Sequence, residues 1–223
     1  METYTIFEYL LELNQETAKE LINIYHNQNN KKTLVVFPRK RDKKIRISEQ
    51  ELRFVMTSLH GEFSHPNLSF SVETPTEKEY SFSKKGKRSA SSDLTFYNKN
   101  SKILNLEFKA HNPRQESIDK DIEKLTNEPY YGAWVHLFEN EDSGTVLSLF
   151  EKFKISFAKY TKPQRPISFH ILILKTKTLL SRKGMDSDLA YFNANKIFDL
   201  NYSEWKNLSV GKHFIRDWQI DKF

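Results

Sequence analysis

Two carboxylates and one ammonium group follow the pattern Asp-x13-Glu-x-Lys near the middle of the chain. Asp93 is the first carboxylate, Glu107 is the second, and Lys109 stands two residues after Glu107. Carboxylate oxygens are the ligands that hard cations such as Mg²⁺ prefer. An ammonium group beside such a cation can stabilise negative charge that develops during a reaction. The three residue types are therefore suited to binding a hard cation if the fold brings them together.

The segment from Asp93 to Lys109 predicts an antiparallel β-hairpin that turns at "NKNSK". The expected pairs are Leu94 with Leu106, Phe96 with Leu104, Tyr97 with Ile103, Thr95 with Asn105 and Asp93 with Glu107. Because side chains alternate between the faces of a strand, one face is apolar and the other becomes polar toward the open end. Directly opposed carboxylates repel unless a cation lies between them. The hairpin therefore predicts a cation-binding group at its open end.

Helices and strands alternate around this hairpin. Ser48 and Glu51 form a capping-box pattern followed by apolar residues at helical spacing, which predicts a helix over 48–60. Further helices are predicted over 4–27, 115–127 and 145–160, and further strands over 68–72, 79–83, 131–139 and 167–175. This order predicts an α/β fold with a central mixed sheet flanked by helices. The length of 223 residues fits a single domain over 1–223.

The hairpin sequence "DLTFYNKNSKILNLEFK" resembles the active-site hairpin of the PD-(D/E)xK nuclease superfamily. It departs at one position, because Ser92 stands where the pattern has proline. The predicted helix, three antiparallel strands, helix and strand are similar to the restriction-endonuclease-like core of that superfamily. The resemblance covers a nuclease core over roughly 45–140, between an N-terminal helical segment (1–30) and an unassigned C-terminal elaboration (141–223).

The resemblance implies a Mg²⁺-dependent deoxyribonuclease that acts as an endonuclease in restriction or repair. Asp93, Glu107 and the backbone carbonyl of Phe108 would bind the Mg²⁺, and Mn²⁺ is expected to substitute for it. Lys109 would orient the attacking water and stabilise the charge that develops at phosphorus.

Members of the superfamily also place a glutamate on the first core helix. Glu49 is the preferred candidate for this catalytic position because it stands three residues before the apolar Leu52, on the same side of the predicted helix. Glu51 is the second choice, since it also suits the capping box with Ser48. Both glutamates also suit the first turn of a helix on electrostatic grounds alone.

Positive charge favours DNA as the partner. The chain has 35 Lys and Arg residues against 29 Asp and Glu residues, which gives a net charge of +6. The predicted contacts to DNA phosphates come from the basic loop before Asp93 and from the helix after the hairpin, and the residues are Lys84, Lys85, Lys87, Arg88 and Gln115. Charge runs are also common on solvated surfaces that bind nothing, so that alternative stays open.

Composition excludes other classes of site. The chain has no cysteine, which excludes disulfides, thiolate catalysis and Cys-based zinc sites and is typical of intracellular proteins. No apolar run approaches the ~18 residues of a membrane span, and the N-terminal sequence is unlike a signal peptide. We therefore expect a cytoplasmic protein with no membrane partner. A homodimer would provide the two sites needed to cut both strands of a duplex.

Two other interpretations remain open. The first is a catalytically silent nucleic-acid-binding module that retains the nuclease fold. The second is a protein-interaction or structural domain in which Glu107 and Lys109 are a surface ion pair worth at most about 1 kcal/mol. The nuclease interpretation is preferred because all three residues of the pattern are present and the flanking elements agree with it.

Overall fold

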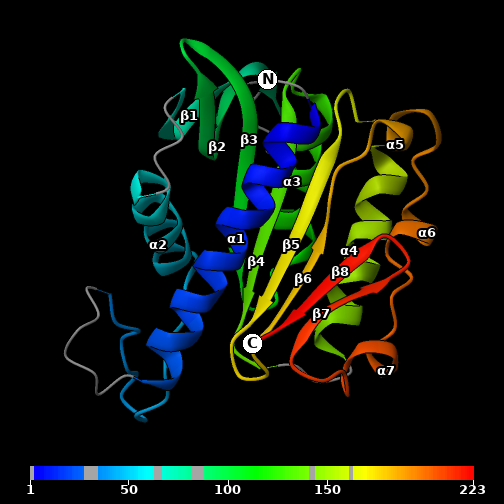
Figure 1. Cartoon of the computed structure of the whole chain (residues 1–223). Coiled ribbons are helices and arrows are strands. Elements are labelled where there is room, and N and C mark those ends of the chain that lie inside the picture. The colour runs from blue at the N-terminus through cyan, green and yellow to red at the C-terminus, as the bar shows by residue number, and fades with distance from the viewer. Residues whose placement is uncertain (1–2, 28–34, 63–66, 82–87, 141–143, 161–162) are drawn as a thin grey trace.

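Eight strands of the described residues form one mixed sheet in the order β1-β2-β3-β4-β5-β6-β8-β7 (Figure 1). The computed structural model describes residues 3–27, 35–62, 67–81, 88–140, 144–160 and 163–223. The strands are β1 (Leu68–Tyr80), β2 (Arg88–Asn98), β3 (Ser101–Ala110), β4 (Tyr131–Phe138), β5 (Ile167–Ile173), β6 (Thr178–Arg182), β7 (Gly211–Ile215) and β8 (Trp218–Lys222). Strands β3, β4 and β5 are parallel to one another, whereas the remaining neighbours pair antiparallel. The predicted α/β class and mixed sheet are confirmed.

Helices cover both faces of this sheet. They are α1 (Thr3–His26), α2 (Glu49–Glu62), α3 (Gln115–Asn127), α4 (Thr145–Lys159), α5 (Asp186–Tyr191), α6 (Ala194–Ile197) and α7 (Tyr202–Trp205). One apolar cluster joins α1 and α2 to one face through residues such as Leu52 and Phe96. A second cluster joins α3 and α4 to the opposite face through residues such as Ile122 and Trp134. In Figure 1, α1 crosses in front of the central strands.

The four long helices agree with the sequence prediction to within two residues at each end. The agreement follows from their apolar stripes, which point at the sheet. Ile118, Ile122 and Leu125 of α3 are all buried at the spacing that the sequence predicts. The helix that follows the hairpin is therefore fixed in rotation as well as in position, and its remaining faces are determined too.

The hairpin of β2 and β3 forms in the predicted register near its open end. Leu94 pairs with Leu106, Thr95 with Asn105, and Phe96 with Leu104. Closer to the turn the prediction was wrong, because Tyr97 pairs with Lys102 instead of Ile103. The turn contains only two residues, and its first residue, Lys99, has a φ of 56°. A two-residue turn fixes which residues pair directly beside it. The register then shifts between Phe96 and Tyr97, and the rest of the hairpin pairs as predicted.

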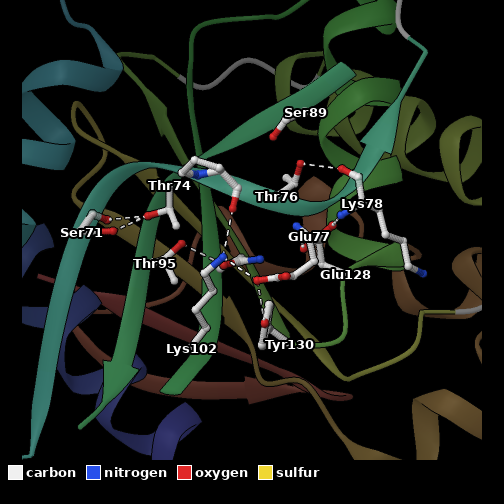
Figure 2. Close-up of polar contacts among 12 residues, drawn as sticks. Ser71, Thr74, Thr76, Glu77, Lys78, Ser89, Thr95, Lys102, Glu128 and Tyr130 are labelled. Carbon is white, nitrogen blue, oxygen red and sulfur yellow. Dashed lines mark hydrogen bonds and ion pairs between the residues drawn. The ribbon is translucent and has the colours of Figure 1, made fainter. Parts of the chain in front are cut away.

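Strand β1 is one continuous strand with an irregular middle, where the sequence predicted two strands around a turn at "TPTEK". The buried carboxylate of Glu128, just after α3, accepts hydrogen bonds there. Its donors are the backbone N–H of Glu77 at 2.9 Å and that of Lys78 at 3.1 Å (Figure 2), together with the hydroxyl of Tyr80 at 2.8 Å. Because a distant carboxylate satisfies these donors, the strand continues and the predicted turn was wrong.

The C-terminal third extends the same sheet. Strand β5 begins at the predicted residue, and β6, β8 and β7 follow it in space. All five residues of β8 are buried although Gln219, Asp221 and Lys222 are polar. This strand has no apolar run that would reveal it, which explains why the sequence left the region unassigned.

Strand β5 carries a histidine that is buried and uncharged. The ring nitrogens of His170 lie 3.1 Å from the hydroxyl of Ser181 and 3.3 Å from that of Ser168. Burial lowers the pKa of His170 to about 3. The unfolded chain takes up the proton below about pH 6.5, so the stabilising contribution is complete above that pH and is lost as the pH falls toward 3.

This difference in pKa predicts how stability responds to acid. Between pH 7 and pH 5 the free energy of unfolding of the wild-type protein should fall by about 2 kcal/mol more than that of His170→Gln. Urea denaturation at the two pH values measures the difference. Parallel pH dependences for the two proteins would contradict a buried, neutral imidazole.

No helix within the described ranges has the length and apolar character that a membrane crossing requires.

Candidate active site

The hairpin brings the two predicted carboxylates to the same end of the sheet. Asp93 lies on β2 and Glu107 on the neighbouring β3. The Oδ2 atom of Asp93 accepts a hydrogen bond of 2.7 Å from the backbone N–H of Phe108. This bond holds the Asp93 carboxylate against the strand segment that carries the second carboxylate.

Glu107 is completely buried, which is unusual for a carboxylate. Its Oε2 atom lies 2.7 Å from Nζ of Lys124, whereas its Oε1 atom is buried without a hydrogen-bond partner among the described residues. Burial raises the pKa of Glu107 well above its ordinary value, Asp121 raises it further, and Lys124 opposes both effects. Glu107 therefore has one oxygen fixed by the protein and one that lacks a partner.

Lys109 is held by the carbonyl next to it and by a carboxylate of α3. Its ammonium donates a hydrogen bond of 3.0 Å to the carbonyl of Phe108 and lies 2.7 Å from Oδ2 of Asp121. Burial lowers the pKa of Lys109, but Asp121 and Asp93 outweigh this effect, so the net pKa is raised. The ammonium is therefore charged and lies between the two strands and α3.

Two members of this group, Asp121 and Lys124, were missed by the sequence analysis. Both lie on α3, three residues apart, with 3.0 Å between Lys124 Nζ and Asp121 Oδ1. Asp121 therefore links the two ammonium groups. A signal was present in the sequence, because each of the two residues stands beside a member of the predicted buried stripe of this helix. A charged side chain beside a buried stripe is itself largely buried, and burying a charge without a partner is costly.

The structure separates the two glutamates considered for the first core helix. The pKa of Glu49 is raised mainly by burial, while Lys109 lowers it and Asp93 raises it, so Glu49 lies within electrostatic reach of the group. The carboxylate of Glu51 instead accepts a hydrogen bond from the hydroxyl of Ser48. Glu51 thus pairs with Ser48 at the start of the helix, and Glu49 is the glutamate of α2 that interacts with the charges of the hairpin. We name Glu49, Asp93, Glu107, Lys109, Asp121 and Lys124 the charged cluster.

The predicted DNA contacts lie elsewhere or outside the described residues. Lys84, Lys85 and Lys87 fall in the range 82–87, which the structure does not describe. Arg88 begins β2, and its backbone pairs with Tyr80. The side-chain amide of Gln115 donates to Asp119, to the hydroxyl of Ser156 and to the carbonyl of Lys152, so it joins α3 to α4. None of these contacts tests binding to DNA, which stays a prediction.

The oxygen atoms at the open end of the hairpin are of the kind that binds Mg²⁺. Asp93, the unpartnered oxygen of Glu107 and the carbonyl of Phe108 are all oxygen ligands. Within the described ranges, no group of three or more His, Cys, Asp or Glu side chains has the arrangement of a complete metal site. Mg²⁺ usually takes one or two carboxylates and keeps several waters, so a pair of carboxylates suffices.

The chain matches no family model, no curated protein and no solved structure. The likeness to the PD-(D/E)xK superfamily therefore depends on the residues of the hairpin and on the order of the surrounding elements.

Proposed function

We propose that this protein is a metal-dependent nuclease with a restriction-endonuclease-like core, which hydrolyses phosphodiester bonds in DNA. The observation that carries the proposal is the state of Glu107, a fully buried carboxylate with an unpartnered oxygen beside Asp93. A buried charge lowers stability unless something compensates for it. Its charge interacts with those of Asp93 and Lys109, which supports a functional reason for keeping it.

The core of the proposal consists of α2, β1, β2, β3, α3 and β4, which follow one another in the order that the resemblance predicts. β1, β2 and β3 are antiparallel, and α3 crosses over to the parallel β4. This arrangement supports the restriction-endonuclease-like interpretation. It also explains why α3 lies over the open end of the hairpin, where it contributes Asp121 and Lys124.

Each residue of the site then has a chemical role. Asp93, Glu107 and the Phe108 carbonyl would hold Mg²⁺, which when bound would polarise the phosphate and lower the pKa of water. Lys109 would orient the water and stabilise the negative charge that grows on the phosphate oxygens. The water gives up a proton as its oxygen bonds to phosphorus, the bond to the leaving sugar oxygen breaks, and that oxygen takes up a proton. Glu49 would accept a hydrogen bond from a water at the edge of the group.

Nicking of supercoiled plasmid with Mg²⁺, with Mn²⁺ and with EDTA tests the proposal. Cleavage should require the metal and should fall about 10²–10³-fold in Lys109→Met, because this change removes the charge that faces the phosphate. Lys102→Met is the matched control. Lys102 lies on the same strand, but its ammonium contacts the carboxylate of Glu77 (Figure 2) and the carbonyl of Pro75.

Metal-independent nicking, or nicking that Lys109→Met leaves unchanged, would contradict the proposed site. Retention of plasmid in a gel-shift assay at low salt without any cleavage would favour the silent binding module.

A further inference from the structure

Lys124 occupies a place that is lined with oxygen atoms. Its Nζ atom lies 2.7 Å from Oε2 of Glu107, 3.0 Å from Oδ1 of Asp121 and 2.9 Å from the backbone carbonyl of Ser91. These three acceptors come from β3, α3 and β2, respectively. The Lys124 side chain is only 8% exposed. Two carboxylates and a carbonyl around one positive charge make up the kind of shell that binds a hard cation.

The charged cluster contains more carboxylates than ammonium groups. Glu49, Asp93, Glu107 and Asp121 are four carboxylates, whereas Lys109 and Lys124 are two ammonium groups. Glu107 shows where a further cation would be held, because Oε1 is buried without a partner among the described residues while Oε2 already contacts an ammonium.

We propose that the ammonium of Lys124 permanently fills the place of a second cation, so that the charged cluster takes a single divalent ion between Glu107 Oε1 and Asp93. The inference rests on the proposed metal-dependent function and adds the number of ions to it. Lys124 acts as a positioning residue. It holds Glu107 by one oxygen, and the other oxygen, which has no partner among the described residues, would bind the ion.

A purely structural role for Lys124 makes a different prediction. A lysine that only neutralises Glu107 could be replaced without any change in the number of bound ions. If instead Lys124 stands in for a cation, its removal leaves an anionic pocket formed by Glu107 Oε2, Asp121 Oδ1 and the Ser91 carbonyl. Such an oxygen shell should accept a second divalent ion.

Counting bound Mn²⁺ by calorimetry and by electron paramagnetic resonance, without DNA, tests the inference. The wild-type protein should bind one ion per chain, and Lys124→Met should bind two. Lys124→Arg keeps a positive charge in the pocket and should bind one. Lys120→Met removes a charge from the exposed surface of the same helix and should also bind one. Asp93→Asn should lose the wild-type ion, which assigns the counted ion to the charged cluster.

Thermal unfolding supplies a second measurement that does not depend on cleavage. Lys124→Met should be destabilised in EDTA, because Glu107 and Asp121 lose a buried counter-charge. Mn²⁺ should then raise its melting temperature by more degrees than it raises that of the wild-type protein. If Lys124→Met does not fold in EDTA, it is purified in Mn²⁺, and the count for the wild-type protein still tests the inference.

Two ions per wild-type chain, one ion in Lys124→Met, or no ion at the site would each overturn the inference. Failure of the proposed function is distinguishable from these results. A protein that binds one Mn²⁺, gains a second in Lys124→Met and cuts no DNA keeps the inference and loses the nuclease. A protein that cuts DNA and binds two ions per wild-type chain keeps the proposed nuclease function and loses the inference about Lys124.

Discussion

Replacing Glu107 by glutamine should lower metal-dependent nicking about 10³-fold and at the same time make the metal-free protein more stable. The loss of activity follows from the loss of a charged ligand in a buried site, where each kcal/mol of transition-state stabilisation has a large effect on rate. The change is nearly isosteric, so packing around β3 is retained. Glutamine also keeps a carbonyl oxygen that can accept the hydrogen bond from Lys124.

The gain in stability follows from the direction of the pKa shift. Burial first, and then Asp121, raise the pKa of Glu107 above its value in the unfolded chain. A group with a raised carboxyl pKa contributes most to stability when it is protonated, and that contribution is lost as the pH rises through the folded-state pKa. The charged form of Glu107 therefore lowers stability, and a neutral amide that keeps the hydrogen bond from Lys124 should raise the free energy of unfolding.

Urea denaturation in EDTA and plasmid nicking in Mg²⁺ measure the two effects on the same preparations. Glu116→Gln is the control, because Glu116 is an exposed acid on the first turn of α3 and should change neither quantity. A Glu107→Gln protein that is less stable and still cuts DNA would show that Glu107 is an ordinary structural residue.

The largest loss of stability is expected from Asp188→Ala, at about 3–5 kcal/mol. The guanidinium of Arg182 on β6 is 3% exposed and contacts both oxygens of Asp188, at 2.8 and 2.9 Å. Asp188 also accepts a hydrogen bond from the backbone N–H of Met185, which ties the start of α5 to the sheet. Truncation leaves a buried guanidinium without its bidentate partner, and such a charge is costly in the interior.

The same arginine supplies a matched control for this prediction. Oδ2 of Asp217 lies 3.9 Å from the guanidinium of Arg182, but the Asp217 side chain is 68% exposed. Asp217→Ala should therefore change the free energy of unfolding by less than about 0.5 kcal/mol. Equal effects of the two alanine variants, measured by urea denaturation, would contradict the role assigned to burial and bidentate geometry.

Features governed by local periodicity were predictable from the sequence. The stripes of α1 to α4 and the apolar face of the hairpin carry period signals that depend on few distant contacts. The preference for Glu49 over Glu51 also agrees with their positions, because the hydroxyl of Ser48 already holds the carboxylate of Glu51. The pairing near the turn was not predictable in the same way, since the turn geometry at Lys99 displaced the register.

Features that depend on distant partners could not be read from local patterns. β1 continues through "TPTEK" because Glu128, far along the chain, accepts its free amide hydrogens. The polar β8 is buried because it lies between β6 and β7 in the sheet. The link from Glu107 through Lys124 to Asp121 depends on how α3 lies over the hairpin. Spacing along the sequence gives the candidates for such a link but not their distances.

Because α3 follows the hairpin along the chain, the charged cluster is completed only after α3 has been synthesised. Asp93, Glu107 and Lys109 leave the ribosome before Asp121 and Lys124, and the parallel pairing of β4 with β3 follows the crossover through α3. Parallel pairing requires a crossover and forms after local hairpins. A nascent chain that ends before α3 therefore holds no fixed Glu107 and no Asp121–Lys109 contact. Because the cluster is completed together with the sheet, unfinished or truncated copies should be inert, and the cell should meet the charged cluster only in fully folded molecules.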